Sequence, residues 1–598
     1  MCGIVGYTGH RRAQPILLDS LKKLEYRGYD SAGIAVQGKA IELYKDKGEI
    51  ADLERQLPAI PGNVGIAHTR WATHGKPSRE NAHPFLDCKK RIVLAHNGII
   101  ENHMEVKEKL IEEGHRFTSE TDTEVAVHLV EKYYEGDLEK AMLRALKDID
   151  GTYAFVAFNS SEKGKIVAAR KESPLILGKG NDENFVASDI PALLKETNRV
   201  MQLHDGQVAT LTPESVRIVD LKGREVKREW KTISWSIEDA EKGGFEHFML
   251  KEIYETPETI HNTLLGRVSN LELGPTLRNE FSHVKMIACG TSYHAALTGK
   301  YIFEEIANIP TTVELASEYR YSSRSRERPL TILISQSGET ADTIGASREA
   351  KLRGCPVFAI TNYMGSSLAR EVGERNVLYT RAGIEIGVAA TKTFTAQLIA
   401  LYLTAMHLAS QRHAKTLEHI RRMAEELRTL PRVSWRVLGK ANEIRELAKK
   451  YHKVKDAYFI GRGLNYPVSL EGALKLKEIS YIHGEGYAAG ELKHGPLALL
   501  SEDTLVVAIA VQDRTYQKMI GNIGEVNARN SPILAIGYEG DEYLHKYVDD
   551  IIYIPKVSTV FSPVPVSIVL QLFAYYVAKE LGREIDKPRH LAKTVTVE

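Results

Sequence analysis

Residues 287–318 and 460–491 align without a gap at an offset of 173 residues, and this repeat limits the possible folds more than any other feature. Ten of the 32 aligned positions are identical, including the glycine pairs Gly290/Gly463 and Gly299/Gly472. Nearly the same offset relates residues 397–402 to residues 571–576. Chance matches between helical segments would not keep one offset over about a hundred residues, so the sequence predicts two copies of one subdomain.

The second half of the chain alternates short apolar segments, Gly/Ser turns and long helical segments. This order is typical of α/β domains with a parallel sheet. We place the first copy, with its leading helices, at residues 246–412 and the second copy at 450–590. A charged helical connector is expected at 413–449, and a short tail follows at 591–598.

The first half has a different texture. Short β-branched segments such as VGIAH and TYAFVAF are separated by Gly and Asn turns, and helical patterns lie near residues 13–24 and 120–134. These features predict an α+β domain of stacked antiparallel sheets between helices at residues 1–225. A polar linker is expected at 226–245.

The bulk composition excludes several classes of protein. A chain of 598 residues is too long for one core, and its net charge of +1 gives no electrostatic case for nucleic acid. The four cysteines form no CxxC pair, which suits a reducing cytoplasm. No signal-peptide pattern opens the chain, and the apolar runs at 398–409 and 564–578 are too short for a bilayer. We expect a multidomain cytoplasmic protein with no membrane partner.

Cys2 is the first candidate for chemistry. If Met1 is removed, as the small second residue favours, Cys2 carries a thiol and a free α-amine whose pKa is about 7.7–8. Such a nucleophile has a general base on its own residue. Taken alone, Cys2 is better explained as a small apolar residue that opens a buried strand.

Polar clusters in the same half supply the partners that such a nucleophile needs. Arg70 can bind a carboxylate through two contacts, and Asp122 can hold an ammonium group. Asn97 and Gly98 combine a side-chain amide with a glycine N–H, which suits an oxyanion hole. Arg27 lies in a polar loop. Ordinary turns and helix caps explain each cluster separately, but together they fit both ends of an α-amino acid.

The segments MCGIVGY, LEYRGYDSAG, HTRWATHG, NAHPF, HNGIIEN and SETDTE resemble the class II glutamine amidotransferase domain, an N-terminal-nucleophile hydrolase. The resemblance implies that Cys2 attacks the glutamine carboxamide while Asn97 and Gly98 hold the oxyanion. It implies that Arg70 and Asp122 bind the carboxylate and the amine, and that Trp71 is a gate. The full implied glutamine-binding set is Arg70, Trp71, Asp122, His83 and Arg27.

Several histidines of this half raise the possibility of a metal site. They are His68, His74, His83, His96 and His103, and none shows HExxH or comparable ligand spacing. Histidines in buried hydrogen-bond networks are commoner than metal ligands. We therefore expect no metal and no other cofactor.

The first repeat contains three candidate phosphate loops. The strand-like TILIS runs into SQSGETADT, where hydroxyls and N–H groups of Ser335, Gln336, Ser337 and Thr340 meet before a helix. Such a site binds phosphate without a lysine. The loop of Cys289, Gly290, Thr291 and Ser292 has the same setting, as does GVAATKT at 387–393. Helix capping explains one loop more readily than three.

The second repeat has ionisable groups where the first has hydroxyls. Glu471, Lys475 and Glu478 follow at i, i+4 and i+7, so they share one helical face flanked by apolar residues. His494 lies in GELKHGP, and Lys593 lies five residues from the C-terminus. A solvated charged face is the alternative. The divergence predicts one repeat for phosphate and the other for proton chemistry.

These features resemble paired sugar-isomerase (SIS) domains, and the whole chain resembles the isomerizing glutamine–fructose-6-phosphate aminotransferases, or glucosamine-6-phosphate synthases. The resemblance implies that His494 opens the ring of fructose 6-phosphate and that Lys593 forms a Schiff base. It further implies that Glu478 moves a proton between C1 and C2 with help from Lys475, and that ammonia is channelled internally. The implied sugar-phosphate set also includes Val388 and Ala592, and a homodimer through the SIS domains is expected.

The chain departs from the family at Ala390, where serine is common. Other amidotransferases would need a diphosphoribosyl loop, an SGGxDS loop or clustered cysteines, and the sequence has none of these. Two alternatives stay open. A non-catalytic sugar-phosphate sensor leaves Cys2, Glu478, His494 and Lys593 unexplained, and a glutaminase without synthase activity has only Ala390 in its favour.

Overall fold

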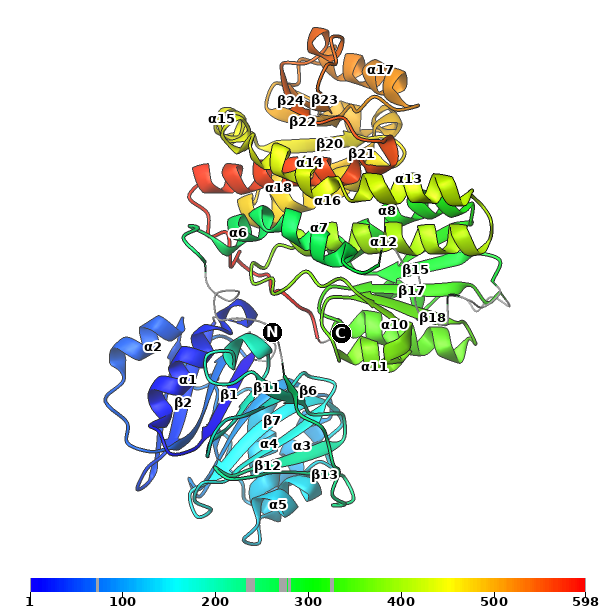
Figure 1. Cartoon of the computed structure of the whole chain (residues 1–598). Coiled ribbons are helices and arrows are strands. Elements are labelled where there is room, and N and C mark those ends of the chain that lie inside the picture. The colour runs from blue at the N-terminus through cyan, green and yellow to red at the C-terminus, as the bar shows by residue number, and fades with distance from the viewer. Residues whose placement is uncertain are drawn as a thin grey trace. The chain divides into compact units, whose positions relative to one another are not determined.

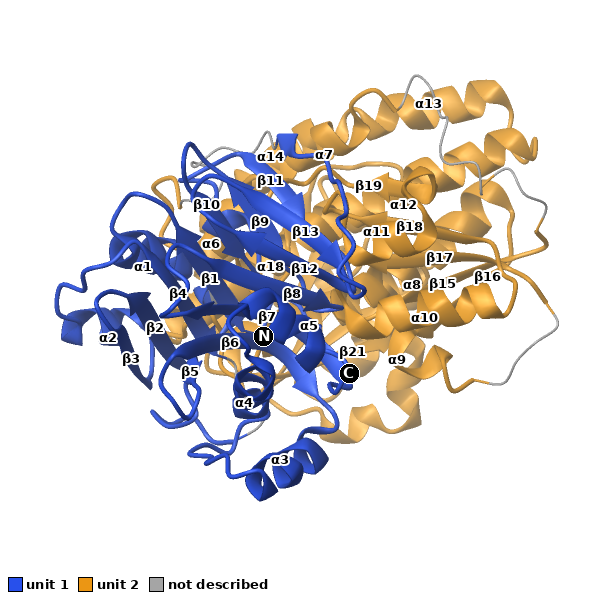
Figure 2. Ribbon diagram, turned by 90° about the horizontal axis from the view of Figure 1, so that it is seen from below, with its two compact units in different colours: residues 1–241, 592–598 blue, residues 242–591 orange. Residues whose placement is uncertain are grey.

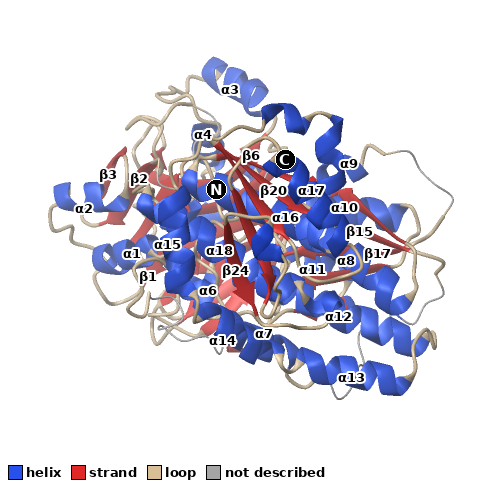
Figure 3. Cartoon of the chain, turned by 90° about the horizontal axis from the view of Figure 1, so that it is seen from above, coloured by secondary structure: helices blue, strands red, loops and turns tan. Residues whose placement is uncertain are grey.

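The computed structural model describes residues 2–28, 30–70, 75–232, 242–267, 277, 281–322 and 327–596. The chain forms two compact units (Figure 2): residues 1–241 together with 592–598, and residues 242–591. Figure 1 gives the labels of the elements and Figure 3 their type.

The first unit is built on two antiparallel sheets, as predicted. The larger sheet has the order β14 (Lys231–Thr232), β11 (Arg199–Gln202), β9 (Ile176–Lys179), β10 (Asn184–Ala187), β1 (Gly3–Thr8), β4 (Val64–Arg70), β2 (Ser31–Gln37), β3 (Ile41–Lys47). The smaller has the order β13 (Val216–Asp220), β12 (Gln207–Leu211), β8 (Ile166–Lys171), β7 (Gly151–Asn159), β6 (Ile92–Ile100), β5 (Phe85–Leu86).

Alternating apolar side chains make the two sheets pack face to face. Ile4 and Ile66 of the larger sheet share one buried cluster with Val93 and Val156 of the smaller sheet. The outer face of the smaller sheet is covered by apolar residues of helices such as α4, where Val125 and Leu129 are buried. The helices of this unit are α1 (Ala13–Lys22), α2 (Ile50–Gln56), α3 (His103–Glu112), α4 (Thr123–Tyr133) and α5 (Leu138–Ala145).

The antiparallel unit continues further along the chain than the composition indicated. Strand β14, at residues 231–232, lies within the predicted linker at 226–245 and pairs with Arg199 and Val200 of β11. The C-terminal residues from Ala592 onward also group with this unit rather than standing as a separate tail. A strand of two residues in a charged segment is too short to show a hydrophobic period in the sequence.

The second unit contains two five-stranded parallel sheets with the same strand order, which confirms the α/β repeat. One has the order β16 (Thr311–Leu315), β15 (Val284–Ala288), β17 (Leu330–Ser335), β18 (Val357–Thr361), β19 (Val377–Tyr379). The other has the order β21 (His483–Ala488), β20 (Asp456–Gly461), β22 (Thr504–Ile509), β23 (Ile533–Tyr538), β24 (Asp550–Ile554).

The repeat extends to backbone conformation. Gly290 and Gly463, which are equivalent at the 173-residue offset, both have φ of 53°, a value that favours glycine. Asn308 and Tyr481 are also equivalent, and both are left-handed C-caps, of α8 (Gly290–Ala307) and α16 (Asn465–Ser480). The two copies therefore turn from strand to helix, and end the helix, in the same way.

Long apolar helices lie between the two parallel sheets in Figure 1. They are α8, α12 (Lys392–Gln411), α16 and α18 (Pro563–Glu580). Among the described helices, one segment, Thr559–Glu580, is long and apolar enough to cross a membrane. However, 94% of its most apolar 18-residue stretch is buried inside the protein. The run at 564–578 therefore lies in a helix longer than the run itself, which corrects the expectation that it is too short for a bilayer, and the burial of that helix is typical of a core helix.

The other helices of this unit border the sheets or connect the copies. The connector expected at 413–449 is helical: α13 (Leu417–Leu427), α14 (Leu430–Leu438) and α15 (Ala441–Tyr451). The remaining helices are α6 (Phe248–Tyr254), α7 (Thr256–Leu264), α9 (Ala316–Tyr319), α10 (Ala341–Leu352), α11 (Ser367–Val372) and α17 (Tyr516–Asn527).

Candidate functional site

Cys2 lies directly before β1, and two side chains from other elements hold its carbonyl oxygen. Arg27, at the end of the 3-10 turn η1 (Glu25–Arg27), donates from Nε at 3.1 Å, and Asn97 of β6 donates from Nδ2 at 3.0 Å. Arg27 is buried and also pairs with Asp189 at 3.1 Å. The backbone of the proposed nucleophile is therefore fixed on two sides, while Cys2 itself keeps partial exposure to solvent.

His68 of β4 orients the amide of Asn97. Its Nε2 lies 3.1 Å from both the Asn97 Oδ1 and the His96 carbonyl oxygen, which are acceptors, so Nε2 carries the proton. Burial lowers the pKa of His68 to about 3, so the ring is neutral. The amide oxygen of Asn97 thus faces His68 and its NH₂ group faces Cys2, as an oxyanion donor requires.

Gly98 follows Asn97 on β6 in a conformation that only glycine adopts readily. Its φ is 133°, and a Cβ atom would lie 2.1 Å from the Thr152 carbonyl oxygen. This constraint explains glycine at the position next to Asn97. The role of its N–H as a second oxyanion donor stays a prediction.

Arg70 and Asp122 lie near Cys2 on separate elements. Burial lowers the pKa of Arg70 at the end of β4, and the charges of Cys2 and Asp122 partly oppose that effect. Asp122 precedes α4 but does not cap it with its side chain, because its Oδ2 accepts the Ile100 N–H at 2.9 Å. The structure thus brings together a cation, a carboxylate and the nucleophile that the glutamine prediction requires.

Trp71 and His74 lie outside the described residues. His83, also predicted to bind glutamine, is buried and stacks on His68 with ring centroids 4.2 Å apart. Burial lowers the pKa of His83 well below its usual range, so this ring is neutral as well. Its contact with glutamine stays a prediction.

We expect His68→Phe to lower the kcat of glutamine hydrolysis about 10- to 100-fold, because the Asn97 amide loses the donor that orients it. His68→Gln keeps an N–H donor and is expected to recover most of the loss. Steady-state glutamate release from both variants measures this, with KM for glutamine recorded. A fully active His68→Phe protein would show that Asn97 needs no such orientation.

In the second unit, the SQSGET loop joins β17 to α10 as predicted. Ser335 Oγ lies 3.0 Å from Thr340 Oγ1 and accepts the Gly338 N–H at 3.1 Å, and Ser337 Oγ accepts the Glu339 N–H at 3.1 Å. Gln336 is partly exposed. Hydroxyls therefore gather at the N-terminus of a 12-residue helix, where the helix dipole favours an anion.

The second predicted loop, from Cys289 to Ser292, makes side-chain contacts with the other SIS copy. Cys289 is the N-cap of α8, Gly290 opens the helix, and Ser292 accepts a hydrogen bond from Gln397 at 2.9 Å. Thr291 Oγ1 donates to Glu471 at 3.1 Å and accepts from Lys475 at 3.1 Å. The first turn of helix α8 in the first SIS copy therefore contacts helix α16 of the second.

Glu471, Lys475 and Glu478 form one buried ionic cluster on α16. Lys475 Nζ lies 3.4 Å from Glu471 and 2.5 Å from Glu478. Burial lowers the pKa of Lys475, but the charges of the two carboxylates raise it by more, so the net pKa is above its ordinary value. Lys475 thus stays a cation at neutral pH and acts on the carboxylates by its charge rather than as a base.

The two carboxylates of this cluster differ in what they contact. Glu471 is 2% exposed, and its carboxylate accepts a hydrogen bond from Thr291 and lies 2.8 Å from Nδ1 of His294. The side chain of Glu478 is 20% exposed. The side chain of Glu478 is thus more exposed than that of Glu471, although its Oε2 atom is buried beside Lys475. The contact between His294 and Glu471 was not predicted, because it joins residues from the two SIS copies.

The third loop, GVAATKT, differs from the expectation of a phosphate loop. The carboxylate of Glu385 accepts the N–H groups of Thr391 and Thr393 at 2.9 and 3.1 Å, at the start of α12. The Val388 N–H donates to the Asp586 carbonyl at 3.1 Å. Three donors of this loop are thus already paired within the protein, and an internal carboxylate occupies the N-terminus of this helix.

The remaining predicted residues are not joined to the ionic cluster. His494 ends the 3-10 turn η6 (Ala489–His494) and is exposed, and within the described residues no hydrogen bond or ion pair links it to Glu471, Lys475 or Glu478. Ala592 and Lys593 belong to the first unit. Their roles at the sugar stay predictions.

Comparison with known proteins agrees with this division of the chain. The family model for the SIS domain matches residues 277–407 and 450–580, and the model for the glutamine amidotransferase domain matches 68–195. Relatives from Thermus thermophilus and Methanosarcina acetivorans, both named glutamine–fructose-6-phosphate aminotransferase [isomerizing], are each 50% identical and covered over 100% of both chains.

A solved structure resembles the second unit. It is the C-terminal domain of glucosamine-fructose-6-phosphate aminotransferase from Francisella tularensis, at 38% identity and a TM-score of 0.55, covering 58% of this chain and 99% of that one. An identity of 50% over the full length of both chains is far above what a shared fold alone produces. The chain therefore belongs to the family of isomerizing glutamine–fructose-6-phosphate aminotransferases.

Proposed function

We propose that this protein converts fructose 6-phosphate and L-glutamine into glucosamine 6-phosphate and glutamate. The observation that carries the proposal is full-length identity of 47–50% with relatives named for this reaction. The geometry supports it, because one chain holds a positioned cysteine in its amidotransferase unit and a partly exposed carboxylate, Glu478, in its SIS unit.

At the glutaminase site, the Cys2 thiol gives its proton to the α-amine, which is free once Met1 is removed, and attacks the carboxamide carbon of glutamine. The Asn97 amide and the Gly98 N–H stabilise the oxyanion. Ammonia leaves with the proton, and water hydrolyses the γ-glutamyl thioester to glutamate and free thiol. Arg70 and Asp122 bind the two ends of the amino acid, with Trp71, His83 and Arg27 completing the pocket.

At the sugar site, the hydroxyls of Ser335, Ser337 and Thr340 bind the phosphate, together with Gln336 and the Cys289–Ser292 segment, while Val388 and Ala592 complete the sugar-phosphate pocket. His494 opens the ring, and Lys593 forms a Schiff base at C2 with loss of water. Ammonia then attacks C2 and displaces the lysine amine, and the resulting C2 imine acidifies the C1–H bond. Glu478 removes the proton from C1 and returns it to C2. The ammonium of Lys475 lies 2.5 Å from Glu478 and stabilises its negative charge.

The two half-reactions balance. Hydrolysis of glutamine consumes one water molecule, and amination of the ketose carbonyl releases one.

We propose that ammonia passes between the sites inside the protein. Glutamine labelled with ¹⁵N in its amide, assayed with excess unlabelled ammonium, tests this point: channelled ammonia leaves the label in the amino sugar, and free exchange dilutes it.

The test of the proposed function is an assay of fructose 6-phosphate with L-glutamine, with intact mass recorded on the same sample. We expect glucosamine 6-phosphate and glutamate in equal amounts from chain that lacks Met1. Glutamate without amino sugar would support the alternative of a glutaminase without synthase activity. Neither product from chain lacking Met1 would favour a sugar-phosphate sensor.

We expect Lys593→Ala to lower glucosamine 6-phosphate formation about 10³-fold or more, because the Schiff base at C2 cannot form. Glutamine hydrolysis without sugar is expected to continue. Trapping with borohydride and fructose 6-phosphate gives a second readout, since only the unchanged protein should gain the mass of a reduced sugar. Unchanged amino sugar output would rule out Lys593 as the Schiff-base residue.

We further propose that the protein acts in the cytoplasm as a homodimer that pairs through its SIS domains. Sedimentation at assay concentration distinguishes the 66.8 kDa chain from a dimer. A monomer with full synthase activity would contradict the pairing.

A further inference from the structure

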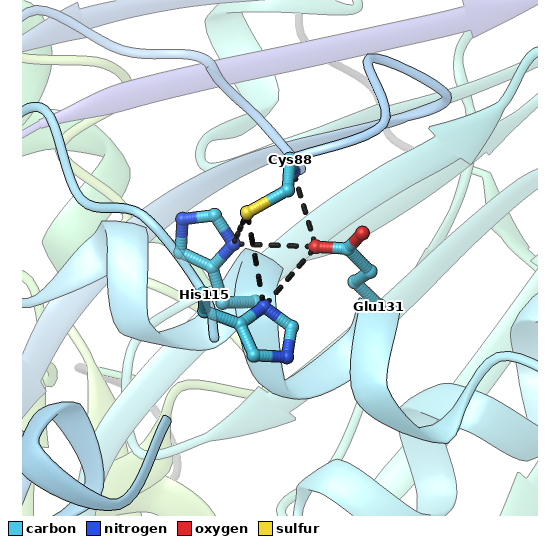
Figure 4. Close-up of side chains that lie close together, drawn as sticks. Cys88, His115 and Glu131 are labelled. Carbon is cyan, nitrogen blue, oxygen red and sulfur yellow. Dashed lines mark hydrogen bonds and ion pairs between the residues drawn. The ribbon is translucent and has the colours of Figure 1, made fainter. Parts of the chain in front are cut away.

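We propose that Cys88, His115, His128 and Glu131 bind one Zn²⁺ ion in a tetrahedral structural site on the amidotransferase unit. One possible ligand atom from each residue lies within 4.8 Å of the others, and Figure 4 shows Cys88, His115 and Glu131 converging. The prediction of no metal rested on the spacing of other histidines in the sequence. It missed this group because its members are far apart along the chain.

The separations among these atoms are those expected of ligands around zinc. Bonds of about 2.3 Å to sulfur and about 2.0–2.1 Å to nitrogen or oxygen place tetrahedral neighbours about 3.6 Å (S to N) and about 3.3 Å (N to O) apart. Cys88 Sγ lies 3.6 Å from His128 Nδ1 and 3.9 Å from His115 Nδ1. Glu131 Oε2 lies 3.4 Å from His128 Nδ1 and 3.3 Å from His115 Nδ1.

A plain hydrogen-bond network explains these distances less well. Direct N–H···O bonds are about 2.7–3.2 Å long, and both imidazole contacts of Glu131 are longer. Glu131 Oε2 accepts a hydrogen bond of ordinary length from the Cys88 backbone N–H instead, at 3.0 Å. Two ring nitrogens, a thiol and one carboxylate oxygen therefore surround a common point without forming tight bonds to one another.

The supporting contacts are of the kind found around metal ligands. The Arg116 N–H donates to Cys88 Sγ at 3.4 Å, a contact that stabilises a thiolate. With Nδ1 of His128 turned to the site, its buried Nε2 makes no hydrogen bond among the described residues, and Glu124 Oε1 lies 3.8 Å from it. Glu131 Oε1 lies 3.8 Å from Lys89, whose side chain is 64% exposed. The side chains of His128 and Glu131 are 1% and 3% exposed.

Charge and ligand type indicate zinc among the common divalent ions. Binding releases the thiol proton of Cys88 to solvent, so one thiolate and one carboxylate neutralise a divalent cation. A mixed S, N and O ligand set suits Zn²⁺, whereas Mg²⁺ and Ca²⁺ prefer oxygen ligands. Four protein ligands complete a tetrahedron and leave no open position for substrate, so the site is structural.

The site joins three segments that the fold brings to one place. Cys88 lies in the loop between β5 and β6, His115 follows α3, and His128 and Glu131 lie one turn apart on α4. Helix α4 begins after Asp122, and β6 carries Asn97. A metal at this point would fasten both loops to the helix that positions a proposed glutamine-binding residue.

The first test is the metal content of untagged, full-length protein purified without chelator. We expect about one equivalent of zinc per chain by mass spectrometry of the metal, and cobalt replacement should give the ligand-field and thiolate charge-transfer bands of a tetrahedral site. Cys88→Ser and His115→Gln should lose both. Cys2→Ala, which removes another thiol of the same unit, and His10→Gln, at an exposed histidine of the same unit, should keep both.

The second measurement is thermal unfolding, which does not depend on catalysis. Chelation is expected to lower the Tm of the unchanged protein by about 3 °C or more, and to leave the Tm of Cys88→Ser unchanged. Less than a tenth of an equivalent of any divalent metal after zinc reconstitution would overturn the proposal. So would zinc that Cys88→Ser retains in full.

Discussion

Replacing Cys2 with alanine is expected to lower glutamine hydrolysis by about 10⁴-fold or more, because no other group can take the place of the nucleophile. The glutamine-dependent synthesis of amino sugar should fall equally. The carbonyl of residue 2 would still accept from Arg27 and Asn97, so the unit should keep its fold. Glutamate release and thermal unfolding measure the two parts of this prediction.

The control for Cys2→Ala is the sugar half of the same protein. Conversion of fructose 6-phosphate to glucose 6-phosphate without glutamine should stay within about twofold, since Glu478, the proposed base of that reaction, lies in the other unit from Cys2. Cys355→Ala, at a buried cysteine of the SIS unit, should keep glutamate release. Glutamate formed by Cys2→Ala at the original rate would exclude the thiol mechanism.

Glu478→Gln is expected to reduce both isomerisation and amino sugar formation by about 10³-fold, within the range for loss of a general base. Glutamine has the shape of glutamate but cannot accept a proton at neutral pH. Glu471 stays 3.4 Å from Lys475, so the buried ammonium keeps one carboxylate partner. Exchange of the C1 proton with deuterated solvent reports the affected step directly.

A matched control for this change is Glu502→Gln, because Glu502 is exposed in the same SIS copy. It should alter neither proton exchange nor stability. Glutamate release without sugar should be unaffected in both variants. If Glu478→Gln exchanged the C1 proton at the original rate, another group would have to be the base.

The contrast between Glu471 and Glu478 shows how a repeat acquires two functions. Both residues lie on α16, whose counterpart α8 carries the hydroxyls of Thr291 and Ser292. Thr291 contacts the ionic cluster directly, at 3.1 Å from Glu471 and from Lys475. The two SIS copies thus meet at this helix pair, while the charges of Glu471 and Glu478 on α16 itself raise the pKa of the buried Lys475.

Local pattern predicted those parts of the fold that depend on period and turn chemistry. The 173-residue offset predicted two α/β copies, and the structure shows two parallel sheets with equivalent strand orders and equivalent glycines at φ of 53°. The alternation of the first half predicted the antiparallel sheets. Strand β14 was missed because two residues carry no measurable period.

The sequence by itself was enough to predict Cys2 as a nucleophile and the Ser335–Thr340 loop as a phosphate site, and it determined the charged face of α16, because each depends on neighbours within a few residues. Only the tertiary structure decided the tautomer of His68, the link from His294 to Glu471 and the meeting of Cys88 with Glu131. Those contacts join residues 28 to 177 positions apart. Chain spacing does not encode such distances, since they are fixed by how sheets and helices pack.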